Sequence, residues 1–308
     1  MEVQCAWSRF DDSSPVWAWS SWSITCQSAH GFGGEEKLKP EEVVAKSLEA
    51  LGTPEARAAA KTRVMKGAGS VEFLVRQTGR LDGTAQFASD AGRTRLEWTF
   101  GHPDYASDQL VFNGKKILVG DMRPSVRSPL ALFVNDYAQA LLKEGLLGGV
   151  TNVGWPLLSD RKLRLSYRGL KELRGKQVHV VRYQSADGGS LLIDLGFDPQ
   201  TYRHVITEYR LNIRGSLPTD YSLYVPGSTA AARALTVYDQ SDIGQTDIHW
   251  QVDEEFDDFR PVDGITLPHA YKLRLSLDSK TKWIAEWKAQ LSEVKQNQDL
   301  GDSVFMLR

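Results

Sequence analysis

The chain has 308 residues, of which 41% are apolar, and this is enough to fill the core of one large domain or two ordinary ones. It carries 37 Lys and Arg residues against 39 Asp and Glu residues, which gives a formal net charge of -2. This balance gives no overall attraction to nucleic acid or to an anionic membrane surface, so we expect no nucleic-acid partner. The sequence holds no run of about 18 apolar residues, which excludes a helix that spans a bilayer.

The N-terminal stretch differs in composition from the rest of the chain. It places four of the nine tryptophans among many serines: Trp7, Trp17, Trp19 and Trp22. The segment PVWAWSSWSITCQSAHG lacks a basic start, its apolar part is broken by Ser, and no A-x-A cleavage site follows, so it is a poor signal peptide. Two interpretations stay open: a poorly ordered extension, or a misplaced start that replaces a true export signal. We expect residues 1–37 to lie outside the fold and residues 38–308 to form a single domain.

The two cysteines, Cys5 and Cys26, also lie in this N-terminal stretch. Their spacing fits neither a zinc site nor a redox motif. Whether they form a single disulfide stays open.

The first predicted helix begins at Pro40, which suits a first helical turn. Glu41 and Glu42 follow at the positive end of the helix dipole. Apolar residues at helical spacing then share one face, and Gly52 ends the pattern. The segment therefore predicts a helix of about three turns.

After Val64 the apolar residues recur at every second position, which is typical of β-strands with one buried face. Turn signals stand between these runs: Leu81-Asp82-Gly83, Asn113-Gly114, Asp187-Gly188-Gly189, Asp198-Pro199, Asp263-Gly264 and Asp278-Ser279. Short turns join only antiparallel neighbours, and a wide sheet curls because strand twist accumulates. The pattern predicts a mainly β (α+β) fold. Its wide curved antiparallel sheet, or half-open barrel, has about eleven strands and covers two or three helices on its concave face.

A helical pattern, SPLALFVNDYAQALLKEGLLGGV at residues 128–150, interrupts the strands. Its apolar residues cover more than one narrow stripe, and Gly148 and Gly149 provide a stop signal. So broad an apolar surface favours a position against the concave face of the sheet.

The search for catalytic motifs is negative. The sequence contains no G-x-S-x-G, H-E-x-x-H, Walker or kinase motif. The six histidines are scattered without metal-ligand spacing, so we expect no enzyme activity, no catalytic residues, no metal and no cofactor. A hydrolase stays as a third hypothesis, and it requires His102, His204 or His269 to lie beside a carboxylate in a pocket.

Three polar stretches have both a chemical and a structural interpretation. DEEFDD at residues 253–258 could bind Ca²⁺, but it lacks EF-hand spacing and its side chains alternate between two faces, so we interpret it as a solvated acidic strand. HPDYASD at residues 102–108 holds a His, two Asp and a Tyr, which could serve acid–base chemistry, but we interpret it as a rim loop. RKLRLSYRGLKELRGK at residues 161–176 could contact acidic lipid head groups. The alternation of Lys162 and Arg164 with leucines instead favours an edge or surface strand whose charged side chains form its solvent-exposed face.

Four tryptophans, at positions 98, 250, 283 and 287, lie on the apolar phase of their strands. Each of them alone is typical of an ordinary core. Several together with the helical segment 128–147 could instead line a hydrophobic pocket, because large rigid aromatic rings suit ligand cavities. The candidate ligand-binding residues are Trp98, Phe112, Leu130, Phe133, Leu141, Trp250, Trp283 and Trp287.

Two phrases, IDLGFDPQTYRHVITEYRL at residues 193–211 and FDDFRPVDGITLPHAYKL at residues 256–273, carry a family resemblance. Together with one helix, the hairpins and the inserted helical segment, they resemble the LolA-like outer-membrane lipoprotein-sorting proteins. The resemblance covers about residues 38 to 300. The functional polar residues of that family have no position-by-position match here, so none is carried over.

The resemblance implies a half-open barrel whose apolar cavity accepts acyl chains without covalent chemistry. The implied function is a non-catalytic carrier of a lipid or of the acyl chains of a lipoprotein, in lipoprotein sorting or envelope lipid trafficking in the periplasm. The implied partners are a lipid or an acylated lipoprotein and an envelope membrane protein, and we expect a monomer. The alternative within the same fold is an envelope-stress sensor or protein-interaction module.

Overall fold

The computed structural model describes residues 38–74, 78–159, 162–186, 189–214, 222–223, 235–236, 247–278 and 282–308. The expectations for residues 1–37, including those for Cys5 and Cys26, lie outside these ranges. So do parts of the turn signals at residues 187–188 and 279. No helix in the described ranges is long and apolar enough to cross a membrane.

The described helices are α1 (Pro40–Leu51), α2 (Pro54–Ala59), α3 (Pro129–Asp136), α4 (Gln139–Lys143) and the 3-10 helices η1 (Gly149–Thr151), η2 (Pro156–Leu158) and η3 (Asp302–Phe305). The described strands are β1 (Thr62–Phe73), β2 (Gly79–Asp90), β3 (Thr94–His102), β4 (Tyr105–Phe112), β5 (Ile117–Val119), β6 (Arg164–Leu173), β7 (Lys176–Gln184), β8 (Leu192–Phe197), β9 (His204–Arg214), β10 (Ser222–Leu223), β11 (Leu235–Thr236), β12 (Asp247–Val262), β13 (Ile265–Asp278) and β14 (Trp283–Gln296).

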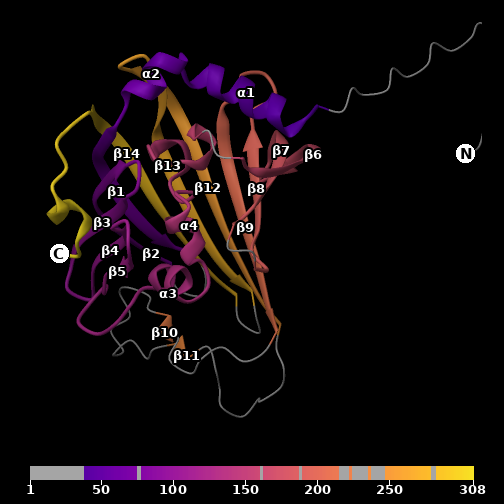
Figure 1. Ribbon diagram of the computed structural model, residues 1–308. Helices are drawn as coiled ribbons and strands as arrows, with labels where there is room; N and C mark the ends of the chain where they lie inside the picture. The colour runs from indigo at the N-terminus through magenta and orange to yellow at the C-terminus, as the bar shows by residue number, and fades with distance from the viewer. Residues whose placement is uncertain are drawn as a thin grey trace, which may run out of the picture. The chain divides into compact units, whose positions relative to one another are not determined.

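Twelve of the described strands form one sheet, in the order β5-β4-β3-β2-β1-β14-β13-β12-β9-β8-β7-β6, while β10 pairs with β11. The neighbours in the larger sheet are antiparallel. The sheet is open, because β5 and β6 stand at opposite ends of this order. Figure 1 shows α3 and α4 in front of the curved sheet, and α1 and α2 across one end of it. The expected mainly β fold is confirmed, with twelve strands rather than about eleven.

Three of the predicted hairpin turns are confirmed. Asn113-Gly114 joins β4 to β5, and the Asn113 side chain accepts hydrogen bonds from the two backbone N–H groups that follow the turn. Asp198-Pro199 lies between β8 and β9, where the Asp198 carboxylate caps the turn in the same way. Asp263-Gly264 joins β12 to β13.

The turn predicted at Leu81-Asp82-Gly83 is wrong, because these residues lie inside β2. A Cβ atom added to Gly83 would lie 1.9 Å from the carbonyl oxygen of Thr99 on β3. Glycine is therefore required here by the close approach of two backbones, and not by a change of chain direction.

The basic stretch at residues 161–176 contains β6, which lies at one edge of the sheet with its charged side chains exposed, as expected. The helix expected from Pro40 is confirmed as α1. A second helix, α2, follows it and was not expected. The Thr53 side chain caps α2 by accepting a hydrogen bond from the backbone N–H of Ala56.

The single long helix expected between residues 128 and 150 is replaced by two short ones, α3 and α4. The break falls at Tyr137 and Ala138, directly after Asn135 and Asp136, which favour turns because their short polar side chains compete for backbone hydrogen bonds. The stop expected at Gly148 and Gly149 is wrong, because α4 ends at Lys143 and Gly145, with a positive φ of 71°, follows its end.

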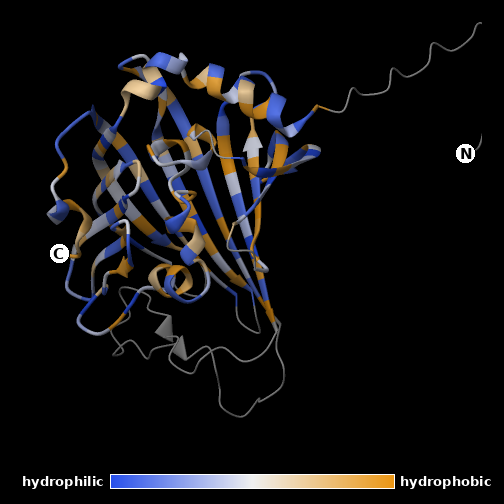
Figure 2. Ribbon diagram, viewed as in Figure 1, coloured by the Kyte–Doolittle hydropathy of each residue, from blue (hydrophilic) through white to orange (hydrophobic). Residues whose placement is uncertain are grey.

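Most of the buried apolar residues form one large cluster between the sheet and the helical segment, and four others form a small second cluster. Figure 2 shows apolar and polar residues alternating along the strands. The buried side chains of β13 are mainly apolar, with His269 as a polar exception, whereas its outward Lys272 and Arg274 pair with carboxylates of neighbouring strands. The concave face of the sheet is therefore an apolar wall that carries the inserted helices.

Candidate functional site

The plug, defined here as residues 128–158, lies against the concave face of the sheet. Its helix α3 contacts β4 and β5, and η1 contacts β9 and β13, so the plug touches strands from both halves of the sheet. Its side chains Leu130, Phe133 and Leu141 are fully buried. The contact between plug and sheet is therefore the first place to look for a binding site.

Seven of the eight candidate ligand-binding residues belong to the central cluster and are at most 4% exposed: Trp98, Leu130, Phe133, Leu141, Trp250, Trp283 and Trp287. The eighth, Phe112, is partly exposed and packs against the same cluster. The structure brings Phe133 of the plug onto Trp250 of the sheet, with ring centroids 5.3 Å apart. Trp283 instead packs on Phe73.

Asp108 anchors the start of the plug to the sheet. Its fully buried carboxylate accepts hydrogen bonds from the hydroxyl of Ser128, which precedes α3, and from the Tyr105 hydroxyl at 2.5 Å. The indole N–H of Trp287 donates to it at 2.6 Å. Burial raises the pKa of Asp108. The rim loop expected at residues 102–108 is wrong, because Tyr105 and Asp108 lie buried on β4.

Glu254 anchors the middle of the plug. Its carboxylate is fully buried and accepts a hydrogen bond from the backbone N–H of Gly148 at 2.6 Å. The hydroxyls of Tyr209 and Tyr271 donate to it at 2.6 and 2.5 Å. Burial raises the pKa of Glu254 to about 7. The solvated acidic strand expected at residues 253–258 is therefore wrong for this residue, which faces the plug.

Arg63 on β1 provides the third anchor. Its side chain is buried and donates to the backbone carbonyls of Val150 at 2.9 Å and Thr151 at 3.1 Å. Burial lowers the pKa of Arg63 to about 10. A buried cation therefore holds the 3-10 turn of the plug through carbonyl oxygens.

His204 contacts the last part of the plug. Its ring stacks on that of Trp155 at 4.8 Å and packs on Phe256 at 4.8 Å. Its Nε2 is hydrogen-bonded to the hydroxyl of Thr207 at 2.8 Å. Burial lowers the pKa of His204 to about 3, so the imidazole is a neutral packing group.

A pocket of about 380 Å³ opens at one edge of the plug, and we call it the rim pocket. It lies between the β2–β3 turn, the start of the β4–β5 turn and two parts of the plug. Its apolar lining consists of Phe112, Leu142, Val153, Trp155, Pro156 and Leu158, and its charged lining includes Arg93, Lys143 and Glu144. The buried indole N–H of Trp155 has no hydrogen-bond partner. The volume is within the range of small-molecule sites, and the lining mixes apolar and polar groups.

The histidines named for a hydrolase contact groups other than carboxylates. His102 accepts a hydrogen bond from the backbone N–H of Asp104, and His269 contacts the carbonyl of Leu267. In the ranges that the structure describes, no group of three or more His, Cys, Asp or Glu side chains is placed to hold a metal ion. The chemistry that these residues offer is apolar contact with a few buried polar anchors.

Sequence reasoning missed these anchors. The polar residues Arg63, Asp108 and Glu254 each sit on the buried face of a strand, and this position is the signal that could have found them. Their plug partners are distant in the sequence and have no separate signal.

No family model and no curated protein matches the chain. It is structurally similar to an outer membrane lipoprotein-sorting protein domain from Vibrio parahaemolyticus, with 12% sequence identity and a TM-score of 0.40 over 85% of this chain and 97% of that one. It is also similar to a LolA superfamily protein from Nitrosomonas europaea, with 12% identity and a TM-score of 0.42 over 88% and 98% of the two chains. The third is a DUF1329 family protein from Desulfovibrio piger, with 11% identity and a TM-score of 0.36 over 86% and 96%. At these low values, no residue role or ligand is transferred from these proteins.

Proposed function

We propose that the chain is a non-catalytic binding protein that holds an acyl chain of a lipid or lipoprotein between the sheet and the plug. The observation that carries this proposal is the contact of two apolar surfaces, held together at three buried polar anchors, with the rim pocket opening beside them. The rim pocket is lined by Phe112, which packs against the cluster that holds the other candidate ligand-binding residues.

The plug is suited to rearrangement around a guest. Its two α-helices have eight and five residues, too short to be stable away from the sheet. Each methylene of an acyl chain that is removed from water contributes about 0.8 kcal/mol of favourable free energy, so burial of about ten methylenes contributes roughly 8 kcal/mol. This gain offsets the loss of contacts between plug and sheet, and uptake stays reversible because no covalent bond forms.

The proposal places the protein in the periplasm, in lipoprotein sorting or envelope lipid trafficking. This part rests on the sequence resemblance at residues 193–211 and 256–273. The partner would be a lipid or an acylated lipoprotein, passed on to an envelope membrane protein.

The proposal is tested with a fluorescent fatty acid titrated into the wild-type chain and two variants. Phe112→Asp places a charge in the rim pocket, and we expect it to weaken binding by about tenfold or more, since burying a charge beside an acyl chain costs over 1.4 kcal/mol. Leu170→Asp is the matched control, because Leu170 is 51% exposed on β6. We expect it to bind like the wild type.

Two results would contradict the proposal. One is an equal effect of the two substitutions, which would place the probe on the outer surface. The other is no binding by a folded wild-type chain, which would favour the protein-interaction alternative.

A further inference from the structure

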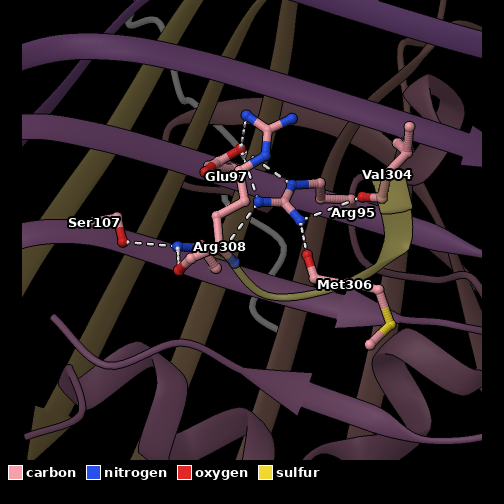
Figure 3. Close-up of polar contacts among 7 residues, drawn as sticks. Arg95, Glu97, Ser107, Val304, Met306 and Arg308 are labelled. Atoms are coloured by element: carbon pink, nitrogen blue, oxygen red, sulfur yellow. Dashed lines mark hydrogen bonds and ion pairs between the residues drawn. The ribbon is translucent and has the colours of Figure 1, made fainter. Parts of the chain in front are cut away.

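The strap, defined here as residues 298–308, follows β14 and covers the face of β3 and β4 that points away from the plug. Figure 3 shows Arg95 at the centre of the contact, surrounded by Glu97, Val304, Met306 and Arg308. The centre of this contact is separate from the contact between plug and sheet, because Arg95 and Glu97 lie on the strand face opposite to Leu96 and Trp98. Arg93 borders both the strap and the rim pocket.

Arg95 binds the main chain of the strap. Its guanidinium is fully buried and donates to the carbonyl oxygens of Val304 at 3.2 Å and Met306 at 2.5 Å. Its other N–H groups donate to Glu97 at 3.0 Å and Gln109 at 2.9 Å, which fix the guanidinium in place. A buried arginine is thus dedicated to two peptide carbonyls.

Gln109 binds the backbone of the strap at Arg308, two residues after Met306. Its side-chain oxygen accepts from the N–H of Arg308 at 3.1 Å, and its side-chain nitrogen lies 3.5 Å from the carbonyl of the same residue. The groove therefore contacts the backbone at residues 304, 306 and 308. The first of these positions lies in the 3-10 helix η3, and Met306, which follows the helix, is extended. The groove therefore holds a short helical turn and the residues after it through their backbone groups.

Three side chains of the strap add sequence preference. Phe305 is 1% exposed and lies under the guanidinium of Arg93, 4.3 Å from the ring centroid. Asp302 pairs with Arg93 at 2.8 Å, and the Arg308 side chain lies 4.0 Å from Glu97. The groove therefore fits an acidic, an aromatic and a basic residue at three-residue intervals.

We propose that this groove is a peptide-binding site for a segment of a partner protein that carries the acidic, aromatic and basic pattern on one 3-10 turn and the residues after it. The strap occupies it in the free chain. The partner displaces the strap, whose first residues, 298–299, are exposed. Its side chains Met306 and Leu307 are 50% and 41% exposed. Because a tethered strap acts at a high effective concentration, the groove binds a free peptide more weakly while the tether is intact.

The test uses the full chain with a protease site inserted after Asp299, which is cut after folding. The probe is the fluorescently labelled peptide GDSVFMLR, the sequence of residues 301–308. We expect a saturable rise in anisotropy with the cut chain and weaker binding to the uncut chain. A probe with Phe305→Ala, or a host with Gln109→Leu, should bind about tenfold more weakly, whereas the host control Arg80→Ala should not change binding.

If the cut chain unfolds, a second variant provides the test of peptide binding. The uncut Phe305→Ala chain has a weakened strap and an intact groove, so it should bind the wild-type peptide more tightly than the uncut wild type does. The inference is overturned if a folded host with a cut or weakened strap binds no peptide at about 1 mM. It is also overturned if the Phe305→Ala probe binds as well as the wild-type probe.

Discussion

The carboxylate of Glu254 accepts a hydrogen bond of 2.6 Å from the backbone N–H of Gly148. This bond joins the concave face of the sheet to the middle of the plug. Because burial raises the pKa of Glu254 to about 7, the charge of this anchor changes near neutral pH.

Glu254→Gln should change how stability depends on pH. The pKa is about 7 in the folded chain and about 4.5 in the unfolded chain, so the folded chain binds the proton more tightly. The contribution of Glu254 to stability is therefore fully present below pH 4.5 and is lost as the pH rises through about 7. It amounts to about 3 kcal/mol. We expect urea unfolding between these pH values to show a shallower decline for Glu254→Gln than for the wild type.

The decline should not vanish in Glu254→Gln, because burial also raises the pKa of Asp108. The control is Glu49→Gln on the exposed face of α1, which should keep the wild-type slope. An unchanged slope in Glu254→Gln would show that this carboxylate is not the titrating anchor.

Arg63→Met should loosen the plug locally. The substitution leaves the carbonyls of Val150 and Thr151 buried without their donor, and an unpaired buried carbonyl costs about 1–3 kcal/mol. We expect hydrogen exchange at the amides of residues 151–153 to accelerate by about tenfold or more, with β13 unchanged. The control Arg80→Met removes only an exposed ion pair with Asp82. Equal exchange in Arg63→Met and Arg80→Met would refute the anchoring role.

The alternation of apolar residues was sufficient to predict the sheet. Its period of two also places Glu254 inward, since this residue shares parity with Trp250, Val252 and Phe256. The cluster of carboxylates around it nevertheless favoured a solvated strand. The partner Gly148 lies 106 residues away, so only the folded sheet brings the two together.

Under the strap, the alternation of polar and apolar residues gives a wrong prediction of burial. Arg95 and Glu97 lie on the polar phase of β3, which predicts exposure, yet both are buried. They are covered by a segment too short to carry a periodic pattern. The turn predicted at Leu81-Asp82-Gly83 is also wrong, because a glycine required by the close approach of two strands gives the same sequence signal as a glycine in a turn.

Gly83→Ala should destabilise the sheet. Its Cβ would lie 1.9 Å from the Thr99 carbonyl, so the backbones of β2 and β3 must separate. We expect a loss of about 2 kcal/mol or more in the free energy of unfolding. Gly101→Ala on β3 is the matched control, because a Cβ there meets nothing within 4 Å. Thermal or urea unfolding of Gly83→Ala and Gly101→Ala measures the difference in stability. Similar stabilities of the two variants would contradict the steric explanation.

The most direct test of the acyl-binding proposal is photolabelling with a fatty acid that carries a diazirine near its tail. After irradiation of the complex with the wild-type chain, the labelled residues are located by tandem mass spectrometry. We expect labels between plug and sheet, at Phe133, Leu141 or Trp250, and competition by unlabelled fatty acid. Labels confined to the outer face of the sheet, or labelling that competitor does not reduce, would contradict a guest held beneath the plug.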